Sequence, residues 1–175
     1  MGVFDYLDVN EVIKVRRSIR KYKRKRIEDA KLLRVLEAGR LSPSASNKQP
    51  WHFIVITDSE SRIKMKETYD RNWFYEAPAI IVVCVDPTIA AVRDGENFWM
   101  VDGSIAMQSM ILQATEEGLG TCWIGAFREA VVRKILEIPS HIRVLAVTPL
   151  GYPDEVKEKV TKRKKMDEII HKNKW

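Results

Sequence analysis

The sequence predicts one α+β domain with a C-terminal arm, and three observations support this fold class. The apolar run Ala79–Val85 has the length and composition of a central strand that is covered on both faces. Residues 98–117 carry apolar side chains around most of a helix, which is typical of a long, buried helix. No internal repeat or low-complexity linker divides residues 1–175, so we expect a single domain whose last part, 152–175, is an extended arm.

The segments around the first polar loop have helical and extended patterns. Residues 9–15 predict a short helix. Residues 28–41 predict a longer helix, because apolar side chains recur at helical spacing and Pro43 follows. Residues 53–57 are mostly β-formers and predict a strand. Residues 60–68 have the polar composition of a surface helix.

The second half of the chain predicts a strand at 121–124, a helix at 129–136 and a strand at 143–150. The long helix at 98–117 carries more apolar surface than a chain of this length can cover by itself. That excess favours a second subunit packed against part of the helix. Burial of the whole helix within its own domain is the alternative.

Composition limits the classes of function. The chain is 45% apolar and 31% charged, so it can bury a core and is not a disordered tail. Its net charge of +6 is concentrated in residues 16–26 and 157–174, which indicates two local sites rather than a basic surface throughout. Cys84 and Cys122 lack metal-ligand spacing and indicate buried, reduced thiols in a cytoplasmic protein. No apolar run is long enough to cross a bilayer and no secretion signal is visible, so no membrane partner is expected.

A basic run, RRSIRKYKRKR, is the first candidate site. In an extended segment, alternation places Arg16, Ser18 and Arg20 on one side, and Arg17 and Ile19 on the other. Two guanidinium groups and a hydroxyl on one side suit a phosphate and neighbouring carbonyl oxygens. A run of charge that only faces water is the alternative.

Two other polar clusters are candidates for a binding site. The loop SPSASNKQPW, residues 42–51, is longer than most connections and rich in donors and acceptors, which is common at ligand sites. A plain surface loop is the alternative. In GLGTCWIGA, residues 118–126, Trp123 stands where the third glycine of a dinucleotide fingerprint would lie, so that fingerprint is excluded. We interpret Gly118 as a helix C-cap and Gly125 as a point where the backbone can approach a flat ligand.

Catalysis by side chains alone is not indicated. The histidines are isolated, and the sequence contains no HExxH motif, nucleophile elbow or phosphate-binding loop. We therefore predict no catalytic side chain and no metal site. If the protein is an enzyme, a cofactor carries out the difficult chemical step.

The motifs RRSIRKY, SPSASNKQPWHFIVI, GLGTCWIGAF and LGYP, with the basic arm that follows, resemble the nitroreductase family of FMN proteins. Their order and spacing match along essentially the whole chain. The resemblance implies a nitroreductase-like α+β fold with a central mixed or antiparallel sheet flanked by helices. It also implies an intertwined homodimer with FMN at the interface, each FMN touched by both subunits.

The resemblance also implies which residues bind FMN. In relatives, the positions of Arg16 and Ser18 hold the phosphate and ribityl chain, and that of Arg20 approaches the flavin pyrimidine edge. The first part of the loop at 43–47 comes from the partner subunit, and backbone amides at 124–126 approach flavin N5. The arm lacks the proline spacing of many relatives, so the register of its phosphate-binding arginine stays open. The FMN-binding residues predicted in this way are Arg16, Arg17, Ser18, Arg20, Pro43, Ser44, Ala45, Ser46, Asn47, Ile124, Gly125, Ala126 and Arg163.

The implied activity is that of an NAD(P)H-dependent flavin oxidoreductase. NADH or NADPH would give a hydride to flavin N5, leave, and be replaced by a nitroaromatic, a quinone or a similar small oxidised substrate. Trp73, Phe74 or Trp99 would either line an aromatic substrate pocket or pack in the core.

Two other classes of function stay open. One is a non-catalytic FMN-binding protein with a storage or regulatory role. The other is a nucleic-acid binder that uses both basic segments. Against the latter, the basic run has one aromatic residue, Tyr22, and no RNA-recognition signature.

Overall fold

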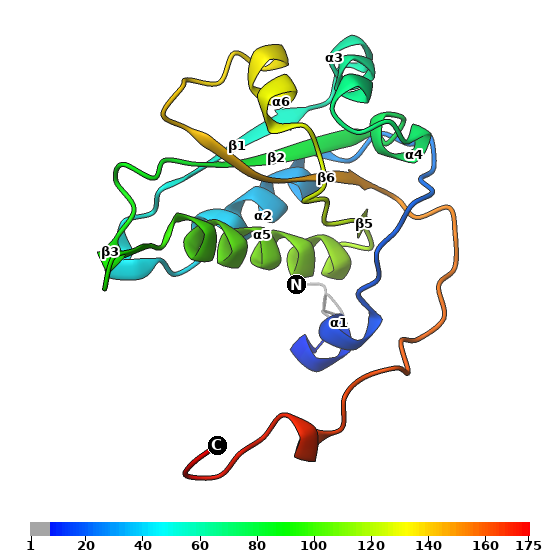
Figure 1. The fold of residues 1–175 in the computed structure, drawn as a ribbon. Helices are drawn as coiled ribbons and strands as arrows, with labels where there is room; N and C mark the ends of the chain where they lie inside the picture. The colour runs from blue at the N-terminus through cyan, green and yellow to red at the C-terminus, as the bar shows by residue number, and fades with distance from the viewer. Residues whose placement is uncertain (1–7) are drawn as a thin grey trace, which may run out of the picture.

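The computed structural model describes residues 8–175, so residues 1–7 of the predicted domain lie outside the described part. Its centre is an antiparallel sheet of four strands in the order β1-β2-β6-β5. Figure 1 shows helices on both faces of this sheet. The bounds of the strands are β1 Trp51–Ile56, β2 Ala79–Val85, β5 Gly120–Thr121 and β6 Arg143–Gly151.

The central strand β2 explains why the core has two layers. All its residues are buried, which confirms the prediction of a strand covered on both faces. Ile81 and Val83 point toward one cluster, with Met107 and Met110 of the long helix. The residues between them point toward a second cluster on the opposite face. The first face is covered by α2 (Asp29–Arg40) and α5 (Trp99–Glu116), and the second by α3 (Ser59–Lys64), α4 (Asn72–Tyr75) and α6 (Glu129–Ile135).

Two glycines allow α5 to approach its neighbours closely. A Cβ at Gly39 of α2 would lie 2.8 Å from Cγ of Met110 and 2.9 Å from Cζ of Phe53. A Cβ at Gly103 of α5 would lie 2.7 Å from a methyl carbon of Val85. Because neither position has room for a methyl group, the helix is held tightly between α2 and the sheet.

Most predicted elements are confirmed to within two residues at each end, two differ, and α4 and a short hairpin were not predicted. The helix α1 spans Val9–Val15, as predicted. The predicted surface helix 60–68 is α3 followed by a 3₁₀ turn, η2 (Met65–Glu67), and the side chain of Met65 is fully buried. The predicted strand 121–124 stops early, and Ile124 forms a single bridge to β6. A hairpin of β3 (Val92–Arg93) and β4 (Glu96–Asn97) was not predicted, because its sequence is short and polar.

The long helix α5 is not buried on all sides. Its outer face exposes Met100, Val101 and Ile105. Burial of the whole helix within its own domain is therefore wrong for this chain. After β6 the arm leaves the body of the molecule, as Figure 1 shows, and its apolar residues are exposed. The arm contains one short 3₁₀ turn, η3 (Met166–Glu168).

Cys84 and Cys122 are buried and unpaired, as predicted. Gly118 directly follows Glu117, the C-cap of α5, and its φ of +73° makes it the helix-ending glycine, one position beyond the predicted cap.

Among residues 8–175, no helix is both long and apolar enough to cross a membrane. The same residues contain no group of His, Cys, Asp and Glu side chains that could hold a metal ion.

Candidate functional site

The basic motif is built into the edge of the sheet by backbone hydrogen bonds. Ser18 forms a parallel bridge with Thr121 of β5, and Ile19 N donates to Thr121 O over 2.8 Å. The side chain of Ile19 is buried against Gly120, where a Cβ would lie 2.7 Å from Cγ1 of Ile19. Arg20 is exposed. The predicted alternation is therefore confirmed at these two positions.

The segment after β6 holds the other side of the basic motif. Lys23 N donates to Tyr152 O over 2.8 Å, and Asp154 N donates to Lys21 O over 2.9 Å. The carboxylate of Glu155 accepts a hydrogen bond of 2.6 Å from Arg20 N. The motif thus lies between β5 and the start of the arm, with its main chain bonded on both sides.

Charge is left uncompensated at the start of the motif. Within residues 8–175, the side chain of Arg16 has no hydrogen bond or ion pair, and Nη1 of Arg17 is buried without a partner. Burial raises the pKa of the neighbouring Cys122 thiol, while the nearby charge of Arg20 and a hydrogen bond from the Ser18 hydroxyl oppose that rise. Two unpaired guanidinium groups beside a hydroxyl form a site that suits a phosphate group.

The backbone of residues 124–126 follows β5, the strand that pairs with the motif. Ile124 is bridged to Val147 of β6, a few residues after Thr121, which pairs with the motif. Gly125 and Ala126 are exposed, and apart from its chain neighbours no atom of residues 8–175 would lie within 4 Å of a Cβ at Gly125. Open space beside an exposed backbone agrees with the predicted approach of a flat ligand.

A pocket of about 650 Å³ lies beside Arg20. Its walls include Trp73 and Asn72 of α4, and the guanidinium of Arg20 lies 5.8 Å from the centroid of a Trp73 ring. Trp73 also packs against the core, whereas Phe74 is fully buried in it. Sequence reasoning missed Asn72, because an exposed asparagine on a four-residue helix carries no recognisable pattern.

The polar loop lies at the opposite end of α5. Ala45 N donates to Oδ1 of Asp102, in the first turn of α5, over 2.9 Å. Thr121 lies beyond the last turn of the same helix, and an 18-residue helix is roughly 27 Å long. Figure 1 shows the end of α2 and β3 near the start of α5, and β5 near its end. One chain therefore does not bring residues 43–47 to the basic motif.

The last predicted residue also lies apart from the motif. Arg163 is exposed on the arm, and its Nη1 donates a hydrogen bond of 3.0 Å to the carbonyl oxygen of Lys162. A single chain thus pairs residues 18–19 with Thr121, three residues before Ile124. The loop at 43–47 and Arg163 stay separate from them.

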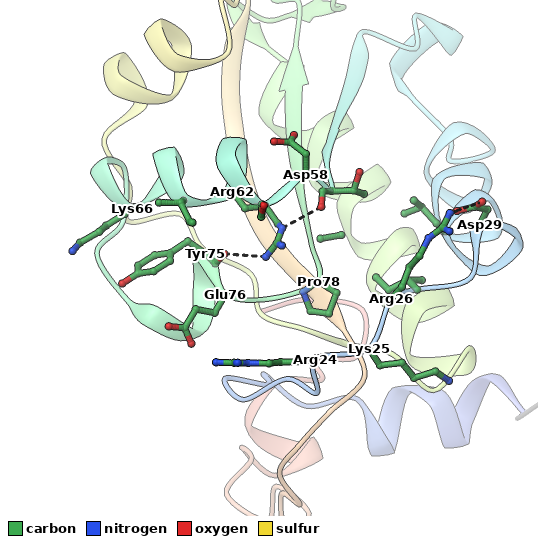
Figure 2. Close-up of a pocket in the computed structure, with 16 residues that line it drawn as sticks. Arg24, Lys25, Arg26, Asp29, Asp58, Arg62, Lys66, Tyr75, Glu76 and Pro78 are labelled. Carbon is green, nitrogen blue, oxygen red and sulfur yellow. Dashed lines mark hydrogen bonds and ion pairs between the residues drawn. The ribbon is translucent and has the colours of Figure 1, made fainter.

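The exposed part of the basic run has mostly acidic neighbours. A larger groove of about 1120 Å³ is lined by Arg24, Lys25 and Arg26 on one side and by α3 and α4 on the other (Figure 2). Arg26 pairs with Asp29 over 2.7 Å. The guanidinium of Arg62 donates hydrogen bonds to backbone carbonyl oxygens, among them that of Ala77 at 2.6 Å. Lys21 and Lys25 also have carboxylate partners. Several cations of the run thus have carboxylate partners among the described residues, in contrast to Arg16 and to Nη1 of Arg17.

Comparison with known proteins identifies a family whose members share this sequence pattern and fold. The nitroreductase family model matches residues 13–70 and 65–152. A protein of Archaeoglobus fulgidus, provisionally named NADH dehydrogenase/NAD(P)H nitroreductase, is 37% identical over 171 residues, which cover 94% of this chain and 97% of the relative.

Two solved structures are similar along almost the whole chain. A nitroreductase family protein of Clostridium difficile 630 has a TM-score of 0.89 and 30% identity, covering 97% of this chain and 99% of the other. An FMN-dependent nitroreductase of Clostridium difficile R20291 has a TM-score of 0.82 and 32% identity, covering 94% and 98%. The family match spans well over half of the sequence, and the chain therefore belongs to the nitroreductase family.

Proposed function

We propose that this protein is an FMN-dependent oxidoreductase that uses NADH or NADPH to reduce nitroaromatic compounds, quinones or similar small oxidised substrates. The observation that carries the proposal is the uncompensated guanidinium of Arg16 and the unpartnered Nη1 of Arg17, which precede Ser18 on the segment that pairs with β5. Its similarity to an FMN-dependent nitroreductase and to a provisional NAD(P)H nitroreductase supports the cofactor and the electron donor.

The residues present suit FMN in their chemistry. Arg16, Arg17 and Ser18 would bind the phosphate and the ribityl chain, because they offer unpaired donors on an edge that the sheet keeps fixed. FMN, when bound, supplies two-electron transfer between the nicotinamide donor and the substrate. No protein acid–base pair is required for the first step, which agrees with the lack of a histidine pair in the sequence.

Arg20 would have a different role from Arg16. It is the residue predicted for the pyrimidine edge of the flavin, where reduction places negative charge. A cation held in place there stabilises the reduced form, and the bond from its own N–H to Glu155 fixes its main chain. Arg20 therefore adjusts the ease of reduction, whereas Arg16 supplies binding.

The working unit of this proposal is a homodimer. A single chain leaves the loop at 43–47 and Arg163 away from the basic motif, so a second copy would supply them. The exposed apolar face of α5 and the apolar side chains of the arm would be covered by the same contact. Obligate interfaces of this kind resemble a core cut in half. We place the protein in the cytoplasm, where buried free thiols such as Cys84 stay reduced.

The test begins with the colour of the purified protein. We expect a yellow dimer with near one FMN per chain, identified by mass after release by heat, and bleaching of the flavin by NADH or NADPH. A colourless protein that cannot be reconstituted with FMN overturns the proposal. A yellow protein that neither nucleotide bleaches is instead a non-catalytic FMN-binding protein with a storage or regulatory role.

Binding to random oligonucleotides, with the salt dependence that phosphate contacts produce, would favour the nucleic-acid alternative. The acidic partners of Lys21, Lys25 and Arg26 make that outcome unexpected.

A further inference from the structure

The polar loop has an unusual backbone for its sequence. Ser46, Asn47 and Gln49 have φ angles of +53°, +53° and +48°, in the left-handed region that favours glycine. Asparagine tolerates this region better than serine or glutamine. Such conformations persist only where the surroundings impose them, and they concentrate at ligand-binding segments.

Three side chains impose this shape. The hydroxyl of Ser44 accepts a hydrogen bond of 2.9 Å from Gln49 N, which closes the loop on itself. Nη2 of Arg93, on the β3–β4 hairpin, donates to the Ser46 hydroxyl over 2.6 Å. Oδ1 of Asp102 accepts the hydrogen bond from Ala45 N over 2.9 Å. Of these three hydrogen bonds, the last joins the main chain of the loop to a side chain buried in the core.

Asp102 is placed to act as a rigid anchor. It is 1% exposed and lies in the first turn of α5, where the helix dipole favours a carboxylate. The next residue, Gly103, fits tightly against Val85 and Leu145, so this turn of the helix has no room to move. Asp102 is therefore held independently of the loop.

The burial of Asp102 is costly, because one of its two carboxylate oxygens gains no hydrogen bond in return. Its second oxygen, Oδ2, is buried without a hydrogen-bond partner among residues 8–175. A buried carboxylate with an unsatisfied oxygen is unfavourable compared with an apolar side chain of similar size. The bond to Ala45 is the compensating contact that the structure describes, which points to the loop as the reason for the residue.

We propose that Asp102 is a positioning residue that holds the 43–49 loop in its binding shape before any ligand arrives. The loop then loses little conformational freedom when it closes on FMN, and affinity is higher for that reason. This inference rests on the proposed function only in assigning FMN to the loop. The anchoring of the loop stands on the hydrogen bond and the burial.

The experiment measures amide hydrogen exchange of the loop in the full-length protein, both free of FMN and loaded with it. Asp102→Ala should speed exchange at Ala45 by roughly ten- to a hundredfold in the FMN-free protein, as expected for the loss of a hydrogen bond to a charged group. Its FMN affinity, measured by fluorescence quenching, should fall as well. Asp102→Asn keeps an oxygen acceptor and should restore most of both values.

Two further variants protect the test against a general loss of folding. Thr115→Ala removes a side-chain bond of 2.9 Å to Ile111 O on the same helix, away from the loop, and should leave loop exchange unchanged. Arg93→Ala removes the tie to Ser46 from an exposed position and should speed exchange there even if Asp102→Ala does not fold.

Unchanged exchange at Ala45 in Asp102→Ala would overturn the anchoring. Faster exchange with unchanged FMN affinity would overturn the role in cofactor binding. If the wild-type protein binds no FMN at all, the proposed function fails, and the exchange data still decide whether Asp102 anchors the loop.

Discussion

The two ends of α5 carry polar segments that are held in different ways. At its C-terminal end, the basic motif is fixed by main-chain bonds to β5 and to residues 152–154, which leaves its side chains available. At its N-terminal end, the loop at 43–49 is fixed by the side chains of Ser44, Arg93 and Asp102. Side-chain deletion should therefore remove ligand contacts at the first end, and change the shape of the backbone at the second.

The largest expected effect is at the C-terminal end of α5. Arg16→Ala should weaken FMN binding by roughly ten- to a hundredfold, because it removes a charge-assisted contact of about 1.5–3 kcal/mol. Thermal stability of the FMN-free protein should not change, since the side chain of Arg16 has no hydrogen bond or ion pair with residues 8–175. Lys25→Ala, whose partner is Glu28, is the matched control and should leave FMN affinity unchanged. Equal losses in both variants would mean that the basic run acts as a diffuse patch.

Substitutions at two glycines should distinguish the packing of the motif against β5 from the open space where FMN is proposed to bind. Gly120→Ala should destabilise the protein by about 1–3 kcal/mol, because its methyl group would meet the buried side chain of Ile19. Gly125→Ala should leave stability nearly unchanged, since apart from its chain neighbours no described residue lies within 4 Å of the new methyl group. It should nevertheless weaken FMN binding by filling the open space. Denaturant unfolding of the FMN-free variants, together with FMN titration, distinguishes the two.

A smaller effect is expected at Arg20, which should act on the midpoint potential of the flavin more than on FMN affinity. Arg20→Ala should lower the midpoint potential of the bound flavin by roughly 30 mV for each ~1.4 kcal/mol of selective stabilisation that is lost. Reduction by NAD(P)H should slow, with a smaller loss of affinity for oxidised FMN than in Arg16→Ala. Equilibration with reference dyes measures the potential. An unchanged potential in Arg20→Ala would remove this residue from the flavin edge.

The smallest effect concerns Glu117, which closes α5 at the end near the motif. A hydrogen bond from Arg34, at 2.8 Å between Nη2 and Oε2, lowers the pKa of Glu117. A lowered pKa in the folded state gives stability that is present above about pH 4.3 and is lost as pH falls through the folded value. Glu117→Gln should cost about 1 kcal/mol at pH 7, because Arg34 is half exposed, and the difference should shrink in acid.

A control with the same chemistry lies on the surface of α2. Glu37 pairs with Arg40, and both side chains are well exposed. Glu37→Gln should therefore show no measurable loss of stability at either pH. Urea unfolding at a series of pH values decides between the two carboxylates. A pH-independent cost of Glu117→Gln would indicate that the loss of its ion pair is not the cause.

The strands and the basic motif could be predicted from the sequence, whereas the contacts at the N-terminal end of α5 could not. Runs such as Ala79–Val85 gave the correct strand because apolar patterning reflects burial on both faces. The motif residues were recognisable from residue type and alternation. The β3–β4 hairpin is too short and polar to be predicted, and its hydrogen bond to the loop comes from Arg93, an exposed residue without a pattern. Asp102 looked like an ordinary helix residue, because its burial depends on contacts far away in the sequence.

The distance between the two halves of the site could not be predicted either. Residues 16–20 and 43–47 are close in the sequence, yet the structure places them at opposite ends of an 18-residue helix. Tertiary packing of α2 against α5 produces this separation. The proposed site therefore requires that each FMN is bound by the basic motif of one chain and the loop of its partner.

Subunit mixing tests that claim most directly. One chain carries Arg16→Glu, which disables the motif, and the other carries Ala45→Arg, which obstructs the loop, and the two are purified together as a mixed dimer by separate affinity tags. If each site combines both chains, the mixed dimer has one site with both defects and one intact site. It should then bind one FMN per dimer with wild-type affinity, while dimers of either variant alone bind it weakly. A mixed dimer without any FMN site of wild-type affinity would contradict the account.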